Sequence, residues 1–489
     1  MTITFIGVFI FVLGSIIALR GSLRQAFLFL FITALFSGSA AVILPGGGSS
    51  IPPDFFALAF IYLRILAPSG GFVGAVPDAI RDHRWLALFV LYGVAMAFIG
   101  PRLFAGDISV YPMRMMTRDS LFDTLPLEPT QQNITGAVYL IGTLLIAMAA
   151  WIASRRSDGP QTLVTAVVAV AWGHIAFGLI GIVARGTPLD TVLDLFRNST
   201  YLQLDDAIGG LIRVRGIFPE ASQYAGFGFA YFVANAELWY RSIRSRATGA
   251  AALAMGAILF FSTSSTAYIA LGLYVVFFIA RVALFPNIAE GSKVKSLFVV
   301  LGAFGVVVAS VMATVPDIVE SIFDMVLSMT VEKPSSDSGA QRLFWAMQGR
   351  DAFLVSYGLG IGPGSFRSSS MIMAIVGSMG LAGIIFFLFH LLAVFQPWRK
   401  STWGPADDYR TAVGGAFASA ALLCLIPPAI NSANAHPTNP FAVFAGAALA
   451  LRSSQLLKRG SQSADGAYGS GHASKWEETK RGGRGMPAR

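Results

Sequence analysis

The chain has 489 residues, of which 55% are hydrophobic and only 12% are charged. A typical soluble domain carries about 25% charged residues, so this composition excludes an ordinary soluble protein. The net charge of +9 does not indicate a nucleic-acid partner, because the basic residues form short clusters between long apolar runs. The composition therefore predicts an all-α fold, a polytopic bundle of transmembrane helices.

A helix needs about 20 mostly apolar residues to cross a bilayer, and about thirteen runs of the chain meet this criterion. The third and the last runs are the weakest, so a count of about 12 is the alternative. The expected spans lie near 3–19, 26–44, 54–75, 85–104, 134–153, 163–184, 221–240, 248–262, 265–284, 296–315, 371–395, 411–430 and 441–456. The bundle should occupy 1–456, followed by a disordered cytoplasmic tail at 457–489 that is rich in Gly, Ser, Lys and Arg.

Basic residues follow every odd-numbered run up to the eleventh. The positive-inside rule places all of these clusters in the cytoplasm, which puts the N-terminus outside and the C-terminus inside. The clusters are Arg20 and Arg24, Arg81 and Arg84, Arg155 and Arg156, Arg241, Arg244 and Arg246, Arg281, Lys293 and Lys295, and Arg399, Lys400 and Arg410. Three of the external connections are then long, at 105–133, 185–220 and 316–370.

Two of these external loops should be structured. In 185–220, apolar residues recur at helical spacing after Thr187 and Pro188, which suit a helix cap and first turn. In 316–370, a similar recurrence begins at Ile318. Each pattern predicts an amphipathic helix on the bundle or on the membrane surface.

Two arginines at the outer mouth of the seventh run form the first candidate site. Arg213 and Arg215 are two residues apart and have apolar neighbours. In an extended segment both guanidinium groups leave the same side, and each planar fork can pair two oxygens at once. The pair therefore predicts a phosphate or diphosphate site. The alternative is that these arginines pair with Asp205 and Asp206, or reach lipid headgroups.

The third external loop contains a second cluster, formed by Arg342, Arg350, Arg367 and Trp345. Arg342 and Trp345 share one face if 339–350 is helical. A tryptophan ring can stack on the C–H face of a sugar, which predicts a glycan site. The alternative role for Trp345 is an anchor at the membrane interface.

The remaining motifs give weaker signals. The run 358–365, GLGIGPGS, resembles a phosphate loop but lacks its Lys and Ser/Thr ending. We interpret it as a flexible turn where backbone approaches substrate, with a simple turn as the alternative. His436 lies in the last external loop, within reach of the mouth of the bundle. No spacing of His, Cys or carboxylate residues indicates a metal site.

Three stretches, in this order within 200–395, resemble the O-antigen polymerase and O-antigen ligase superfamily. RVRGIFPEASQYAG is similar to that superfamily's R-x-R/x-G-x-F-x-E-P-S segment. FFSTSSTAYIAL resembles its T-x-S-R-T helix hairpin. GLGIGPGSFRSSSMIMAIVGSMGLAGIIFFL resembles its G-x-G-x-G-S-F signature, which is followed by a helix with a G-L-x-G turn.

The chain also departs from that pattern. Ala221 replaces the usual proline, and Ser265 and Thr266 stand where the hairpin arginine is expected. Ligases usually carry a His-Asn pair after the G-x-G-x-G-S-F signature, where this chain has three serines at 368–370. The departure favours the polymerase branch or a related exopolysaccharide polymerase, and His436 keeps the ligase open as an alternative.

The resemblance implies a glycosyltransferase of the bacterial inner membrane. It would join undecaprenyl-diphosphate-linked oligosaccharide repeats on the external face, surrounded by membrane lipid, with a chain-length regulator as a further partner. It implies no metal and no cofactor. The expected catalytic residues are Arg213, Arg215 and Arg342, which would hold the leaving diphosphate, and Glu220 as base. The expected substrate-binding residues are Tyr224, Trp345, Arg367 and His436.

Two rival functions remain open at this stage. One is an O-antigen ligase that transfers the finished glycan to a lipid A core. The other is a polysaccharide flippase or secondary transporter. Transporters usually show internal repeats and ionisable residues at the bilayer midplane. Here the charges are concentrated in external loops, which favours chemistry at the surface.

Overall fold

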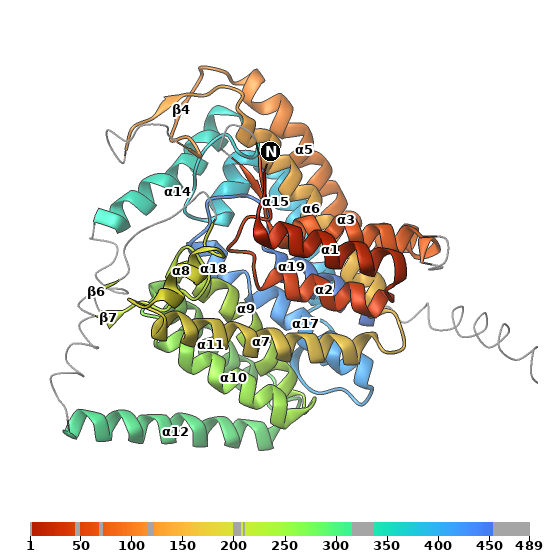
Figure 1. Ribbon diagram of the computed structural model, residues 1–489, viewed down its shortest axis with the longest axis vertical. Helices are drawn as coiled ribbons and strands as arrows, with labels where there is room; N and C mark the ends of the chain where they lie inside the picture. Colours follow the sequence, from red (N-terminus) through yellow and green to blue (C-terminus); the bar gives the residue numbers. More distant parts are fainter. Residues whose placement is uncertain are drawn as a thin grey trace, which may run out of the picture.

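The structure is a computed structural model, and it describes residues 2–44, 49–67, 72–114, 122–198, 207–208, 211–314 and 337–452. The fold is all-α, and the strands among the described residues are short and lie before the first helix or between helices (Figure 1). Its helices are α1 Phe5–Arg20, α2 Leu23–Ala34, α3 Pro53–Leu66, η2 Val73–Ala75, α4 Val76–Asp82, α5 Arg84–Leu103, α6 Gln131–Ser154, α7 Gly159–Val183, α8 Pro188–Asp194, α9 Ala221–Tyr240, α10 Ser245–Phe260, α11 Ser265–Leu284, α12 Gly291–Thr314, α14 Asp337–Val355, α15 Met371–Phe395, α16 Lys400–Trp403, α17 Tyr409–Leu423, α18 Ile426–Ile430 and α19 Asn439–Arg452.

The strands are two residues long and pair antiparallel. One three-stranded sheet fastens the N-terminus to the connection between α2 and α3, and two hairpins lie in later connections. The strands are β1 Thr2–Ile3, β2 Val42–Ile43, β3 Ser50–Ile51, β4 Ser109–Val110, β5 Leu125–Pro126, β6 Ala207–Ile208 and β7 Leu211–Ile212, with pairs β1–β2, β2–β3, β4–β5 and β6–β7.

Every apolar run predicted from the sequence contains a helix, which confirms the predicted fold class. Among the described residues, 6 helices are long and apolar enough to cross a membrane. They are Arg84–Leu103, Gln131–Ser154, Gly159–Val183, Ser265–Leu284, Met371–Phe395 and the pair Tyr409–Ile430. Helices α1, α2 and α10 are apolar but shorter. The larger predicted number of spans therefore stays a prediction.

Several helices end earlier than the apolar runs suggested, for local reasons. Helix α2 ends at Ala34, because the chain then turns to place Gly38 against the backbone of Phe218, where a Cβ would lie 3.0 Å from the Phe218 Cα. Helix α3 ends before Pro68, since the residue preceding a proline disfavours the helical conformation. The predicted span 411–430 is divided into α17 and α18, and the break precedes two consecutive prolines.

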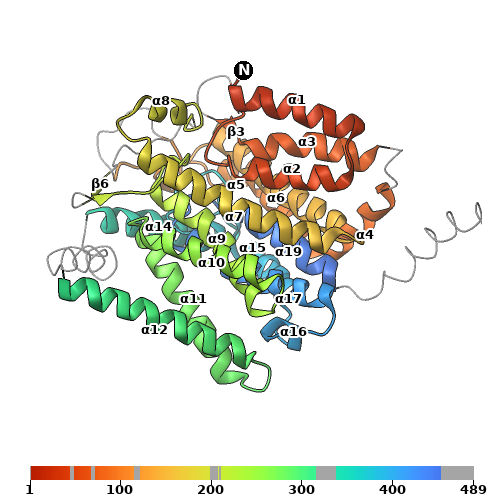
Figure 2. The ribbon, with the colours of Figure 1, turned by 60° about the horizontal axis from the view of Figure 1, so that its bottom comes forward.

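The centre of the bundle is formed by α6, α9, α17 and α19. Helix α19 packs against α6 and α17, and α17 packs against α9. Small residues make these contacts close: a side chain at Gly446 would meet the Ala147 carbonyl oxygen at 2.1 Å, and one at Gly415 would meet the Ser401 carbonyl oxygen at 2.0 Å. Such residues let transmembrane helices approach backbone to backbone. Helix α12 lies at the edge of the molecule in both views (Figures 1 and 2).

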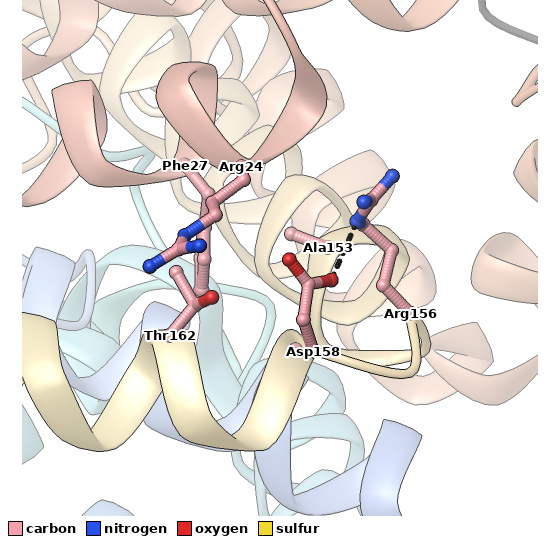
Figure 3. A pocket seen from close by; sticks show the side chains of 7 residues that line it. Arg24, Phe27, Ala153, Arg156, Asp158 and Thr162 are labelled. Carbon is pink, nitrogen blue, oxygen red and sulfur yellow. Dashed lines mark hydrogen bonds and ion pairs between the residues drawn. The ribbon is translucent and has the colours of Figure 1, made fainter.

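The predicted basic clusters gather at one end of the bundle, which we call the basic end. Arg410 donates to the carbonyl oxygen of Arg156 at 3.1 Å, so α17 caps α6 there. Arg156 also pairs with Asp158 at 2.9 Å. Where α2, α6 and α7 meet, Arg24, Asp158 and Thr162 line a shallow surface depression (Figure 3).

The opposite end, which we call the loop end, carries α8, the β6–β7 hairpin, α14 and α18 (Figures 1 and 2). Thr187 is the N-cap of α8, as the sequence predicted. The helix predicted from Ile318 onward lies outside the described residues, as does the predicted tail at 457–489.

The two ends should lie on opposite sides of a membrane. Reporter fusions at Ser157, between α6 and α7, and at Asp107, between α5 and β4, should therefore report opposite compartments, with Ser157 in the cytoplasm. Two fusions that report the same compartment would contradict this orientation.

Candidate functional site

The predicted arginine pair lies directly after the β6–β7 hairpin. Val214 is buried, whereas Arg213 and Arg215 on either side of it are partly exposed, which agrees with the predicted alternation of an extended segment. Arg213 also lies close enough to Tyr268, at the start of α11, for the two side chains to interact electrostatically. The Asp205 and Asp206 of the alternative interpretation lie outside the described residues.

The turn after the arginine pair is fixed by Arg197, a residue that the sequence did not indicate. Gly216 has a φ of +54°, and a Cβ there would lie 3.2 Å from the Phe177 carbonyl oxygen, so glycine is needed. Arg197, which is 4% exposed, donates Nε and Nη2 to the Gly216 carbonyl oxygen at 2.9 and 2.8 Å. Its Nη1 pairs with Asp190 at 2.7 Å and Asp194 at 3.2 Å, which ties the turn to α8.

Glu220 and Tyr224 have different environments although both belong to the first turns of α9. Glu220 is the N-cap of α9, is partly exposed, and accepts a hydrogen bond from the Ser222 hydroxyl at 2.9 Å. Within the described residues it forms no ion pair with an arginine. Tyr224 is 0% exposed, stacks on the His174 ring at 3.9 Å and donates to the His174 carbonyl oxygen at 3.2 Å. These are packing contacts, and the predicted contact of Tyr224 with substrate stays a prediction.

The second predicted cluster forms around α14. The helix predicted at 339–350 is confirmed by α14, so Arg342 and Trp345 do share a helix. The Arg367 guanidinium carbon lies 4.5 Å from the centre of the Trp345 ring. Tyr111 packs against Trp345 at 5.4 Å between ring centres, and its carbonyl oxygen accepts from the Arg367 backbone N–H at 2.9 Å. Arg350 remains apart, with its side chain 59% exposed.

The glycine-rich run 358–365 is a packed turn. The N–H groups of Ile361 and Gly362 donate to carbonyl oxygens of Gly377 and Ser378, where α15 is interrupted by the non-helical Gly380. A Cβ at Gly362 would lie 2.4 Å from a backbone oxygen of α5. The glycines therefore serve close helix packing, which supports the alternative of a simple turn.

The loop 431–438 is hydrogen-bonded to the serines at 368–369 and, through them, to α14. The Ser368 N–H donates to the Ala433 carbonyl oxygen, and the Ser432 N–H to the Ser369 carbonyl oxygen, both at 3.3 Å. The Ser369 hydroxyl in turn donates to the Arg342 carbonyl oxygen at 2.5 Å. Helix α18, which precedes this loop, packs against α9, α11 and α15.

His436 occupies the far side of the same loop. Its ring lies 4.8 Å from the ring of Tyr139 on α6. Both residues are partly exposed. Desolvation lowers the pKa of His436 to about 4, so its imidazole is neutral at neutral pH and can accept a hydrogen bond.

Sequence reasoning did not find the residues beside His436. Arg114 lies close enough to Tyr139 to interact with it electrostatically. Three residues after His436, the Asn439 side chain donates to the buried carboxylate of Asp54. Asp54 was a detectable signal, since an ionisable residue within an expected span is a functional candidate by default. Tyr139 gave no such signal, because an aromatic residue in a span is usually a packing residue.

Comparison with known proteins adds no assignment. No protein-family model matches the chain, and no curated protein matches it. The functional argument therefore rests on the loop end itself, where Arg367 lies over Trp345. The loop 431–438, which carries His436, is hydrogen-bonded to Ser368 and Ser369 beside Arg367.

Proposed function

We propose that the chain is an integral-membrane glycosyltransferase that polymerises undecaprenyl-diphosphate-linked oligosaccharide repeats on the external face of a bacterial inner membrane. One observation supports the proposal: at the loop end, Arg367 lies over the Trp345 ring and Tyr111 packs against it, although the three residues come from distant parts of the sequence. Guanidinium forks suit a diphosphate, and aromatic ring faces suit the C–H faces of sugars. A lipid-linked oligosaccharide offers both groups in one molecule.

The proposed reaction needs cations and a base. A hydroxyl oxygen of the acceptor sugar bonds to the anomeric carbon of the donor, while the bond from that carbon to the diphosphate oxygen breaks and the lipid diphosphate leaves. Arg213, Arg215 and Arg342 are proposed to stabilise the charge that grows on the leaving group. Glu220 is proposed to take the hydroxyl proton. Its Oε2 accepts from Ser222, which leaves Oε1 for the substrate hydroxyl.

The O-antigen ligase is the second candidate, and one observation favours it. The resemblance places a His-Asn pair of ligases where this chain has serines at 368–370. Those serines are hydrogen-bonded to the loop 431–438, which carries His436. An imidazole is thus available beside that position from another part of the chain.

Analysis of lipid-linked and surface glycans in a deletion strain separates the functions. A polymerase defect should leave single-repeat products, and the wild-type gene should restore long chains. Full-length chains that stay on the lipid carrier would replace the proposal with the ligase. Loss of repeats from the external face would replace it with the transporter.

The proposed reaction should need neither metal nor nucleotide. The diphosphate leaving group carries the driving force, and the arginines supply the positive charge. Purified protein mixed with lipid-linked repeats should therefore elongate chains in the presence of EDTA and without nucleotide. Activity that disappears with EDTA and returns with a divalent metal would contradict this prediction.

A further inference from the structure

Two groups of similar chemistry lie at the loop end. The first, the α14 group, consists of Trp345, the Arg367 guanidinium above its ring at 4.5 Å, and Tyr111. The second, the α6 group, consists of Tyr139, the His436 ring 4.8 Å from it, and Arg114 within electrostatic reach. Each group combines an aromatic face with nitrogen-containing side chains.

The two groups are neighbours through the chain itself. Tyr111 belongs to the α14 group and Arg114 to the α6 group, so at most about 11 Å separates their Cα atoms, three residues at 3.6 Å each. The loop 431–438 connects them a second time, because it bonds to Ser368 beside Arg367 and also carries His436. The Cα atoms of Tyr111 and Arg114 are therefore no farther apart than a few sugar rings.

Resting on the proposed function, we infer that these groups are two sugar subsites, with the α14 group binding the donor chain and the α6 group binding the acceptor chain. A polymerase joins two chains built from the same repeat, so it needs two subsites of similar chemistry next to each other. The α14 group takes the donor side because α14 and the β6–β7 hairpin, which precedes Arg213, lie at the same edge of the loop end (Figures 1 and 2). The α6 group lies on α6 and in the loop before α19.

The α6 group is also held in place for binding. The Asn439 side chain donates to the buried Asp54, and the Thr143 hydroxyl, which donates to the Tyr139 carbonyl oxygen at 2.9 Å, also lies 3.4 Å from the Pro437 carbonyl oxygen. These contacts fix the loop next to His436 on both α6 and α3. A sugar that stacks on Tyr139 therefore meets a preformed surface, which reduces the entropy lost on binding.

The test measures donor and acceptor separately with the full-length protein in detergent. The acceptor probe is the free oligosaccharide repeat, released from its lipid by mild acid and therefore without diphosphate, added at fixed saturating lipid-linked donor. Tyr139→Leu should raise the KM for this acceptor about fivefold, since an aromatic contact contributes about that factor. The KM for the lipid-linked donor should not change. Tyr139→Phe keeps the ring face and should behave as wild type.

Matched variants decide the outcome. Tyr92→Leu removes another partly exposed tyrosine, on α5 outside both groups, and should leave both KM values unchanged. If Tyr139→Leu fails to fold, His436→Gln is measured instead and should raise the acceptor KM alone. A wild-type acceptor KM in the variant that is measured overturns the inference, as does equal impairment by Tyr139→Leu and Tyr139→Phe. Wild-type protein that binds the free repeat yet never forms polymer would instead refute the proposed function. The inference that the α6 group binds sugar would then still stand.

Discussion

Replacing Glu237 by glutamine should lower the free energy of unfolding by about 3–5 kcal/mol, the usual effect of removing one partner from a buried ion pair. Glu237 lies near the basic end of α9 and is 0% exposed. Its carboxylate pairs with Arg241 at 2.6 Å and with Arg281 of α11 at 2.8 Å, and both arginine side chains are also 0% exposed. Without the carboxylate, two cations would remain in the bundle with no counter-charge.

The surroundings of Glu237 explain why the bundle cannot easily adapt. Tyr274 donates its hydroxyl to the carboxylate at 3.1 Å, and Arg241 donates Nη2 to the Thr402 carbonyl oxygen at 2.7 Å. Arg281 lies 4.0 Å from the Tyr240 ring centre. The network therefore fixes α9 to α11 and to α16.

Thermal unfolding in detergent, followed by size-exclusion chromatography, measures this effect. Glu128→Gln is the control, because Glu128 is exposed at the loop end, and it should change stability by less than about 0.5 kcal/mol. Arg241→Gln combined with Glu237→Gln should recover part of the loss, since it removes one of the uncompensated cations. A Glu237→Gln protein as stable as wild type would mean that the Glu237 ion pairs contribute no net free energy to folding.

The positions of the helices along the chain could largely be predicted from the sequence, because the length of an apolar run reflects the thickness of the bilayer. The ends of the helices could not, since they depend on contacts such as Gly38 with Phe218. The role of Arg241 and Arg281 was also missed. Both were counted among the cytoplasmic basic clusters, although the spacing of Glu237 and Arg241, four residues apart, is typical of a helical ion pair.

The candidate site could be predicted only in part. Segments with arginine or tryptophan in polar loops stand out against an apolar chain, so the sequence indicated Arg213, Arg342 and Trp345. Their neighbours come from distant positions: Tyr111 meets Trp345, and Tyr139 meets His436. Such pairs are set by how the helices pack, and no local pattern in one sequence reports them.

Replacing Arg215 by lysine should slow chain elongation at least about tenfold, the rate effect of about 1.4 kcal/mol. A hydrogen bond to a charged group contributes about 1.5–3 kcal/mol, and lysine keeps the charge but loses the planar pair of donors. Charge on the leaving diphosphate grows toward the transition state, so the loss should appear in turnover more than in binding. Arg213→Lys should have a similar or smaller effect.

Elongation at saturating lipid-linked substrate, with matched amounts of folded protein, measures both variants. Arg350→Lys is the control, because the Arg350 side chain is 59% exposed and lies 3.5 Å from Asp351, so it should be nearly silent. The turn that carries Arg215 is fixed by Arg197 through the Gly216 carbonyl oxygen, and lysine at 215 leaves those bonds intact. A slow variant would therefore reflect lost donors and not a displaced turn. If both variants elongate at the wild-type rate, the pair binds lipid headgroups and the leaving group is held elsewhere.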